Sequence, residues 1–496
     1  MSGSPPKDEG SNRNAIWEFG RQVRKRIVGV ENTVTLFDGE VRPYVNLDNA
    51  ATTPAFRGVV NAVVEFLESY GSVHRGSGVK SRISSEAYEQ ARATVGRFVG
   101  ADPEYHSVIF TSGTTTAINK LARTLAAGGK APTVLYSLME HHSNLLPWRK
   151  HCHAECIGLC AEDGGIDLSS LDQRLAFHKG GVRLVAITGA SNVTGLMPPI
   201  KWIARIAHAH GAELLVDGAQ LVPHRSVRMG PPGRQDSIDY LAFSGHKVHA
   251  PFGIGVLVGP RESFKVHGPE CVGGGAVKLV TPNDIVWEGI PGREESGTPN
   301  VIGAVALAKA IDILTELGME QITGHDRAIR TLLIERLKGI TGIRLYGESD
   351  PCNYDRVGVV SFTAEELQHG RLAAALGHEA GIGARHGCFC ADPYVAHLLG
   401  IGPAELQEYI RQARHNDRSH FPGLVRVSTS AYNTPEEIDY LAHTLRTLLM
   451  HGPRLDYVVE TASGEYSPTT AEGEARARLP DFYAEASRIT DLEEGA

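Results

Sequence analysis

A lysine stands directly after one of the short apolar runs of this chain. The run is residues 240–243, and the sequence Ser-Gly-His-Lys follows it at 244–247. Open α/β sheets bind their ligands beyond the carboxyl ends of their strands, so a lysine in this place can act on a ligand. Its amine can also anchor a carbonyl cofactor as a Schiff base. A surface lysine in a loop is the alternative for Lys247, and the rest of the sequence must decide between them.

A carboxylate follows another apolar run. Asp217 ends the run 214–216, and Gln220 comes three residues later. A carboxylate there can pair with a pyridinium nitrogen and keep it protonated, which turns the ring into an electron sink. Gln220 could donate a hydrogen bond to the phenolate oxygen of the same ring. The alternative for Asp217 is the N-cap of a helix. Together with Lys247, these residues predict a site for pyridoxal 5'-phosphate (PLP).

A small polar segment offers a place for the phosphate. Residues 111–115, Thr-Ser-Gly-Thr-Thr, follow the apolar run 108–110 and lead into a helix-like pattern at 114–125. Backbone N–H groups at a helix N-terminus, with small hydroxyl side chains beside them, bind phosphate. The pair Gly253 and Gly255 is different, because a strand rather than a helix follows it, so it is no dinucleotide fingerprint.

The elements that must position these residues alternate along the chain. From residue 44 to about 320, short apolar runs are separated by helical patterns, which predicts an α/β fold with a mostly parallel sheet covered on both faces. After residue 320 the pattern changes to α+β. The sequence therefore predicts a large PLP-binding domain at 44–320 and a smaller C-terminal domain at 321–450. Further strands are expected at 134–136, 184–187, 214–216, 240–243, 255–258, 357–362 and 424–428, and C-terminal helices at 365–379 and 435–449.

Both ends of the chain differ from the middle in composition. Residues 1–43 form an N-terminal extension, of which 1–14 are rich in Ser, Pro, Gly and charge and are expected to be disordered. The basic residues between 21 and 26 are expected on the solvent-facing side of a short helix. From His451 onward, four arginines stand against ten acidic residues, a net charge of −6. This composition predicts a solvated acidic tail at 451–496, with a short helix near Phe482.

The overall composition narrows the class of protein. Of 496 residues, 42% are apolar and 21% charged, which is ordinary for a soluble globular protein. The net charge of −8 argues against nucleic acid or an anionic membrane as main partner. No apolar run reaches about 18 residues, and the polar start does not resemble a secretory signal. Seven irregularly placed cysteines are typical of reduced thiols and favour the cytoplasm.

Five motifs in series resemble the class V aminotransferase family, whose members bind PLP on fold type I. Within that family they look most like the branch of cysteine desulfurases and selenocysteine lyases. The resemblance runs from about residue 44 to 450 and covers most of the chain. The motifs are Asn-Leu-Asp-Asn-Ala-Ala-Thr at 46–52, Glu-His-His-Ser-Asn at 140–144, Ser-Asn-Val-Thr-Gly at 191–195, Asp-Gly-Ala-Gln at 217–220 and Ser-Gly-His-Lys at 244–247.

The resemblance implies a role for each residue of the PLP site. Lys247 would hold PLP as a Schiff base, Asp217 would pair with the pyridinium nitrogen, and Gln220 would lie near the phenolate oxygen. His141 would stack on the ring and take part in catalysis. Asn192 would lie near the substrate and the phenolate oxygen. The implied phosphate ligands are Thr114, Thr115, Ser244 and His246.

The resemblance also implies a substrate site. In the desulfurase branch, an arginine that binds the substrate carboxylate precedes a loop cysteine by five positions, and Arg385 and Cys390 have this spacing. A guanidinium group binds a carboxylate through two bonds, and a thiolate can attack the sulfur of a bound cysteine. A small buried hydrophobe is the alternative for Cys390. Cys388 departs from the bacterial pattern and resembles molybdenum cofactor sulfurases, which leaves open the sulfur acceptor and which cysteine acts.

Two further features concern partners and metals. The segment 296–300 resembles one whose threonine, here Thr298, reaches the phosphate of a neighbouring subunit, so the resemblance implies a homodimer. No metal site is expected from the remaining candidates, because a helix end and a strand would point their side chains in different directions. Those candidates are His151, Cys152, His153, Cys156 and Cys160.

The predicted function is that of a PLP-dependent cysteine desulfurase. Arg385 would hold the carboxylate of L-cysteine or an analogue, Lys247 would remove the Cα proton, and Cys390 would take the sulfur as a persulfide and leave L-alanine. A sulfur-acceptor protein would then be a further partner. The alternatives are a selenocysteine lyase, a C–S lyase acting by β-elimination on a cysteine derivative, and a non-catalytic scaffold subunit. An epimerase or aminotransferase would leave Cys390 without a role.

Overall fold

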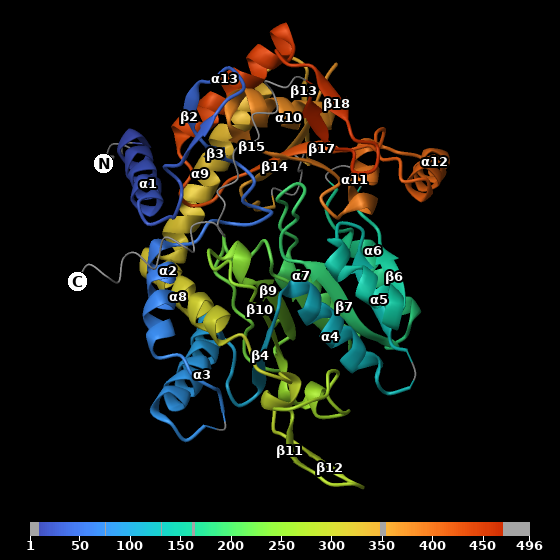
Figure 1. The fold of residues 1–496 in the computed structure, drawn as a ribbon. Helices are drawn as coiled ribbons and strands as arrows, with labels where there is room; N and C mark the ends of the chain where they lie inside the picture. Colours follow the sequence, from blue (N-terminus) through green and yellow to red (C-terminus); the bar gives the residue numbers. More distant parts are fainter. Residues whose placement is uncertain (1–8, 75, 130, 161–163, 348–353, 470–496) are drawn as a thin grey trace, which may run out of the picture.

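A seven-stranded sheet forms the centre of the larger part of the molecule (Figure 1). The computed structural model describes residues 9–74, 76–129, 131–160, 164–347 and 354–469. The strand order is β4-β10-β9-β8-β7-β5-β6, and every pairing is parallel except the two made by β10. The predicted mostly parallel sheet is confirmed. The strands are β4 (His106–Thr111), β5 (Thr133–Ser137), β6 (His153–Ile157), β7 (Val182–Thr188), β8 (Glu213–Asp217), β9 (Tyr240–Ser244) and β10 (Gly255–Pro260).

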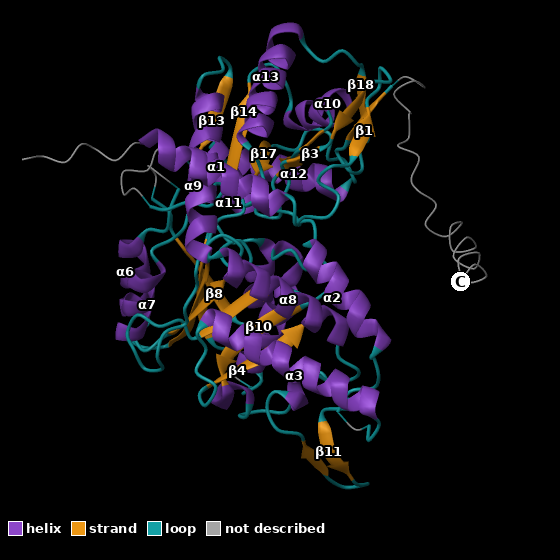
Figure 2. Ribbon diagram, turned by 90° about the vertical axis from the view of Figure 1, so that its left-hand side faces the viewer, coloured by secondary structure: helices purple, strands orange, loops and turns teal. Residues whose placement is uncertain are grey.

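Helices cover both faces of this sheet. Successive strand residues point to opposite sides, so Leu214 and Val216 join one apolar core while Leu215 joins another. The first core also takes residues from α2 (Arg57–Glu68), α3 (Val79–Val99), α6 (Leu168–Phe177), α7 (Ile200–Ala209) and α8 (Val301–Leu317). The second core takes residues from α4 (Thr114–Ala126) and α5 (Leu146–His151). A hairpin of β11 (Val277–Val280) and β12 (Ile285–Trp287) projects from the bottom of the molecule in Figures 1 and 2.

A second, smaller sheet lies above the first in Figure 1. It is antiparallel and has the order β13-β14-β17-β16. Its helices α9 (Met319–Lys338), α10 (His369–Ala380) and α13 (Pro435–His451) share one apolar core with it. The expected helix 365–379 begins later, at His369, because β14 runs on to residue 364 and the Gln368 side chain caps the helix. The strands are β13 (Ile343–Tyr346), β14 (Val359–Ala364), β16 (Arg385–Gly387) and β17 (Leu424–Ser428).

The N-terminal part of the chain packs on this smaller region. Helix α1 (Glu9–Arg24) contacts α9, so the expectation of disorder is wrong for residues 9–14, while residues 1–8 lie outside the described chain. Of the basic residues between 21 and 26, Arg24 does not lie on the solvent-facing side as expected. Its side chain is mostly buried, and its Nη1 lies 2.7 Å from Glu437 Oε1. Strand β3 (Val45–Asn46) pairs with β15 (Ile382–Gly383). Between α1 and β3 lies a hairpin of β1 (Thr33–Thr35) and β2 (Val41–Pro43).

The start of the predicted acidic tail is ordered. Strands β18 (Tyr457–Val459) and β19 (Tyr466–Pro468) form a hairpin, and the Glu379 side chain accepts hydrogen bonds from the backbone N–H groups of Arg454 and Leu455. This part of the predicted tail is ordered, although most of its residues are exposed or half-buried as expected of a solvated segment, and the helix expected near Phe482 lies outside the described residues. The sequence boundaries at 44, 320 and 450 stay a prediction. None of the helices that the structure describes is long and apolar enough to cross a membrane.

Candidate active site

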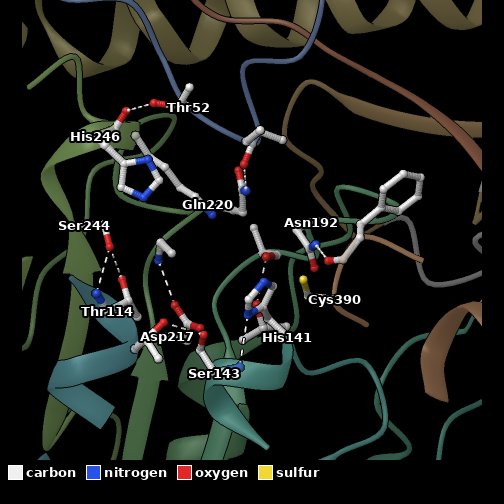
Figure 3. Close-up of a pocket in the computed structure, with 18 of the residues that line it drawn as sticks. Thr52, Thr114, His141, Ser143, Asn192, Asp217, Gln220, Ser244, His246 and Cys390 are labelled. Atoms are coloured by element: carbon white, nitrogen blue, oxygen red, sulfur yellow. Dashed lines mark hydrogen bonds between the residues drawn. The ribbon is translucent and has the colours of Figure 1, made fainter. Parts of the chain in front are cut away.

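A cavity of about 460 Å³ lies at the carboxyl ends of β7, β8 and β9, and the smaller sheet contributes Arg385 and Arg426 to it. It brings together every predicted site residue except Thr298, which is exposed elsewhere. Figure 3 shows Thr114, Ser244 and His246 on one side of it, and Asn192 and Cys390 on the other. The residues around it are Ala50, Ala51, Thr52, Thr114, Thr115, His141, Ser143, Thr188, Ala190, Asn192, Asp217, Ala219, Gln220, Ser244, His246, Lys247, Arg385, Phe389, Cys390 and Arg426.

Lys247 lies in a 3-10 turn, Gly245–Lys247, that follows β9. The turn is fixed from outside, because the carbonyl of His246 accepts hydrogen bonds from the Thr53 backbone N–H at 2.9 Å and from the Thr52 hydroxyl at 3.2 Å. Burial lowers the pKa of Lys247 to about 8, against the opposing attraction of Asp217. Only the neutral amine can form a Schiff base, so this environment makes Lys247 a reactive lysine near neutral pH.

Asp217 ends β8 and is 4% exposed. Its Oδ1 accepts a hydrogen bond from the Ala219 backbone N–H at 3.0 Å, and burial raises the pKa of its carboxyl group. No α-helix begins between β8 and β9 in this fully described stretch, so the N-cap interpretation is wrong. A buried carboxylate gains most from a cation beside it. Gln220 lies nearby, and its side-chain amide donates to the carbonyl of Ala50 at 2.7 Å.

Hydroxyl groups at the start of α4 line another part of the cavity. The Ser244 hydroxyl accepts a hydrogen bond from the Thr114 backbone N–H at 2.8 Å and lies 2.7 Å from the Thr114 hydroxyl. Thr115 and Ser143 are joined in the same way at 2.7 Å. A Cβ at Gly255 would lie 2.4 Å from the backbone of this loop, so only glycine lets β10 approach it. A helix N-terminus surrounded by hydroxyl groups fits a phosphate.

His141 stands at the start of a short 3-10 turn, His142–Asn144. Its Nδ1 accepts a hydrogen bond from the Ser143 backbone N–H at 3.1 Å. Burial, with Lys247 nearby, lowers the pKa of His141 to about 3, so its ring is neutral and carries its proton on Nε2. A flat, neutral ring of this kind suits stacking on an aromatic cofactor.

Glu140 supports this turn from behind and was missed by the sequence analysis. Its carboxylate accepts a hydrogen bond from Asn144 Nδ2 at 2.6 Å and contacts the Ser137 hydroxyl, and Asn144 in turn accepts from Trp148 Nε1 at 3.0 Å. Burial raises the pKa of Glu140 to about 8. The available signal was a carboxylate directly before two histidines.

Cys390 lies on a tightly bound loop. Phe389 and Cys390 both have left-handed backbones, with φ values of 55° and 56°. The carbonyl of Phe389 accepts a hydrogen bond from Asn192 Nδ2 at 2.8 Å, and that of Cys390 accepts from the His142 backbone N–H at 2.7 Å. His142 Nε2 also lies 2.7 Å from an Asp392 carboxylate oxygen. These bonds fasten the exposed thiol of Cys390 over the cavity, so it is no buried hydrophobe.

Cys388 has a different environment from Cys390. Its thiol donates to the carbonyl of Pro422 at 3.3 Å, and it is not among the residues that line the cavity. Burial raises the pKa of the Cys388 thiol to about 12. A thiol that stays protonated and points away from the cavity is a poor nucleophile. Of the two cysteines, the geometry therefore favours Cys390 as the reactive one.

Two arginines line the cavity together with Cys390, and an aspartate binds both of them. Arg385 donates to Asp48 through Nε at 2.9 Å, and Arg426 donates to the same carboxylate through Nη2 at 3.0 Å. Arg426 is 2% exposed, and its buried Nε has no hydrogen-bond partner within the part of the chain that the structure describes. Neither Arg426 nor Asp48 is among the site residues predicted from the sequence. The signal for Arg426 was a charged residue inside a strand whose five residues are all buried.

The metal candidates of the sequence do not assemble into a site. Cys152 and Cys156 lie at the end of α5 and on β6, and burial raises the pKa of each thiol to about 11. Among the residues that the structure describes, no group of three His, Cys, Asp or Glu side chains has an arrangement that could hold a metal ion.

Comparisons with known proteins agree with this geometry. Residues 45–441 match the family model "Aminotransferase class-V". The chain belongs to the class V aminotransferase family. Among its relatives, a probable cysteine desulfurase of Halalkalibacterium halodurans is 33% identical over 425 residues, which cover 84% of this chain and 96% of that protein. A cysteine desulfurase of Haloferax volcanii is 32% identical over 430 residues, 85% of this chain and 93% of its own length.

Solved structures of family members show the same fold. The apo structure of cysteine desulfurase from Thermococcus onnurineus has a TM-score of 0.73 and 30% identity, and the match covers 86% of this chain and 98% of that one. The cysteine desulfurase CsdA of Escherichia coli has a TM-score of 0.70 and 28% identity, with 87% and 98% covered. The predicted PLP fold type I is confirmed. Members of this family depend on PLP, and the reactive lysine, buried carboxylate, neutral histidine and hydroxyl-lined helix N-terminus described above fit that cofactor.

Proposed function

We propose that this protein is a PLP-dependent cysteine desulfurase that converts L-cysteine to L-alanine and a persulfide on Cys390. The observation that carries the proposal is the exposed Cys390 thiol, which lines the same cavity as the reactive Lys247 and the buried Asp217. An enzyme that only moved protons or an amino group would have no use for a thiol fastened there. The names of the relatives support the same activity.

The cofactor would be held by residues of the larger region. Lys247 would bind it covalently, Asp217 would face its ring nitrogen, and His141 would stack on its ring, with Gln220 and Asn192 near its phenolate oxygen. When bound, PLP supplies an electron sink next to the substrate Cα. The residues that would take the phosphate are Thr114, Thr115, Ser244 and His246, with Thr298 of a second chain.

The side chains of the protein account for the remaining steps. Arg385 and Arg426 would bind the substrate carboxylate, which places the Cα proton within reach of the Lys247 amine. The Cys390 thiolate would attack the substrate sulfur, so that a new S–S bond forms while the substrate's Cβ–S bond breaks. The electron pair of the broken bond stays with Cβ, which takes up a proton to become the methyl group of L-alanine.

The test is mass spectrometry of the Cys388/Cys390 peptide after the PLP-loaded protein has turned over L-cysteine. We expect one added sulfur atom on Cys390 and L-alanine in solution. Cys390→Ser should lose alanine formation by about 100-fold or more, whereas the matched variant Cys388→Ser should keep most of it. Pyruvate and ammonia as products would instead indicate a C–S lyase. Undiminished desulfuration by Cys390→Ser, with activity on L-selenocysteine, would favour a selenocysteine lyase.

We further propose a homodimer, a sulfur acceptor and a cytoplasmic location. The projecting hairpin carries apolar side chains that are about half exposed, among them Leu279 and Val280 at 57%, which a second chain could cover. Thr298 is exposed, as a residue serving another subunit must be. A persulfide must be discharged by another thiol, so an acceptor protein is expected. Five described cysteines are free thiols, which suits the cytoplasm: Cys152, Cys156, Cys271, Cys388 and Cys390.

A further inference from the structure

Arg385 and Arg426 stand directly opposite each other on paired strands. They are partners in the antiparallel register between β16 and β17, and both side chains reach the same carboxylate and line the same cavity. Like charges opposite each other on one face of a sheet repel and destabilise the pair. The two guanidinium groups therefore need a counter-ion if both are to face the substrate.

Asp48 is that counter-ion. It follows β3, and its carboxylate contacts both arginines, with Oδ2 at 2.9 Å from Arg385 Nη2 and Oδ1 at 3.0 Å from Arg426 Nη2 and 3.3 Å from Arg385 Nε. Its backbone is fixed as well, because its N–H donates to Asn46 Oδ1 at 3.1 Å and the residue forms a parallel bridge with Ser428. The carboxylate is thus held at one point between the two strands.

The remaining bonds of the arginines show what Asp48 contributes. Arg426 is also held by Asn192, whose carbonyl accepts from Nη1 at 3.0 Å, and its Cζ lies 4.7 Å from the centre of the Phe389 ring. Among the residues that the structure describes, its buried Nε has no hydrogen-bond partner. The side chain of Arg385 is 52% exposed, and the contacts that the structure shows for its guanidinium are those with Asp48. Arg385 therefore depends on Asp48 for its position more than Arg426 does.

We propose that Asp48 is a positioning residue that joins Arg385 and Arg426 into one clamp for the substrate carboxylate. The inference rests on the proposed function, because it takes an amino acid as the ligand. With one carboxylate between two guanidinium groups, the clamp carries a net charge of +1, which matches a single substrate carboxylate. Asp48 would not touch the substrate itself.

The test is the affinity for L-alanine, the sulfur-free product, which needs the clamp but not Cys390. Binding is followed through the visible absorbance of the PLP-loaded protein, beside KM and kcat for L-cysteine. We expect Asp48→Asn to raise the Kd for L-alanine and the KM for L-cysteine by the same factor, about tenfold, with kcat changed by less than about threefold. Asp48→Glu keeps the charge but is longer, so its Kd should lie between those of the wild type and Asp48→Asn.

The matched control is Asp38→Asn. Asp38 is also a partly exposed carboxylate paired with an arginine, at 3.1 Å from Arg454, but it lies away from the cavity. This variant should leave both constants unchanged. A merely structural role for Asp48 would lower the thermal midpoint without changing the Kd.

Two results would overturn the inference. One is an Asp48→Asn protein that retains its visible band and binds L-alanine as tightly as the wild type. The other applies if Asp48→Asn does not fold. In that case Asp48→Glu is measured instead, and an Asp48→Glu protein with the same Kd for L-alanine as the wild type would overturn the inference. Failure of the proposed function would be seen in the wild type, which would then bind L-alanine but would not form it from L-cysteine. This result is distinct from an unchanged Kd in the Asp48 variants.

Discussion

The two sides of the cavity are built in different ways. Lys247 and Asp217 follow neighbouring strands of one parallel sheet, so each is placed by the strand directly before it. Asp48, Arg385 and Arg426 come from three distant segments. They meet because β16 pairs with β17 and because Asp48, which follows β3, bridges to Ser428 at the end of β17. The comparison teaches that the reactive groups depend on local strand ends, whereas the recognition of the carboxylate depends on long-range strand pairing.

The first prediction tests the reactive side of the cavity, which is the side that contains Lys247 and Asp217. Lys247→Ala should lower desulfuration of L-cysteine by about 1,000-fold or more, because one side chain supplies both the covalent anchor and the base. Mass spectrometry after borohydride reduction should find no covalently bound PLP. The matched control is Lys150→Ala, which removes an exposed lysine on α5. A Lys247→Ala protein that still bound PLP covalently would contradict the assignment.

The second prediction compares the effects of Arg385 and Arg426, which together with Asp48 form the recognition side of the cavity. Arg426→Lys should raise KM for L-cysteine by about 100-fold and Arg385→Lys by about tenfold, because lysine keeps the charge but loses the planar fork. The buried Arg426 should matter more than the half-exposed Arg385, whose charge is screened by water. Steady-state kinetics decide the order, and equal effects on KM would mean that exposure does not separate the two residues.

The third prediction concerns the pH dependence of the reactive side. Since the pKa of Lys247 is lowered to about 8, its amine is charged below that pH and neutral above it. The rate at which apoprotein forms its Schiff base with added PLP should rise about tenfold per pH unit up to pH 8 and then level off. Asp217→Asn should move this midpoint lower, because the carboxylate of Asp217 raises the pKa of Lys247. A rate that kept rising beyond pH 10 would indicate an unperturbed lysine.

The reactive side could be predicted from the sequence because its signals are local. Asp217 and Lys247 each stand directly after a short apolar run, and the structure confirms a strand at each of those runs. The motif at 140–144 contains Glu140, but its support of the His141 turn depends on burial, which the sequence does not show.

The recognition side could not be predicted in full because it depends on register. Arg385 was found through its spacing to Cys390, whereas Arg426 lies in an apolar strand 36 residues after Cys390, and only pairing of β16 with β17 sets it opposite Arg385. Asp48 is even more distant in sequence, because it precedes Arg385 by 337 residues. The order of the hairpin 457–468 also comes from tertiary contacts with Glu379 that a polar composition does not reveal.

The left-handed backbone at Phe389 and Cys390 sets stability against activity in the evolution of this protein. Each of these residues costs roughly 1–2 kcal/mol in that conformation, and glycine would avoid the cost. Selection for heat resistance alone would therefore favour the loss of Cys390, while selection for sulfur chemistry would keep it. Cys390 thus combines a costly backbone conformation with the thiol that the proposed reaction needs.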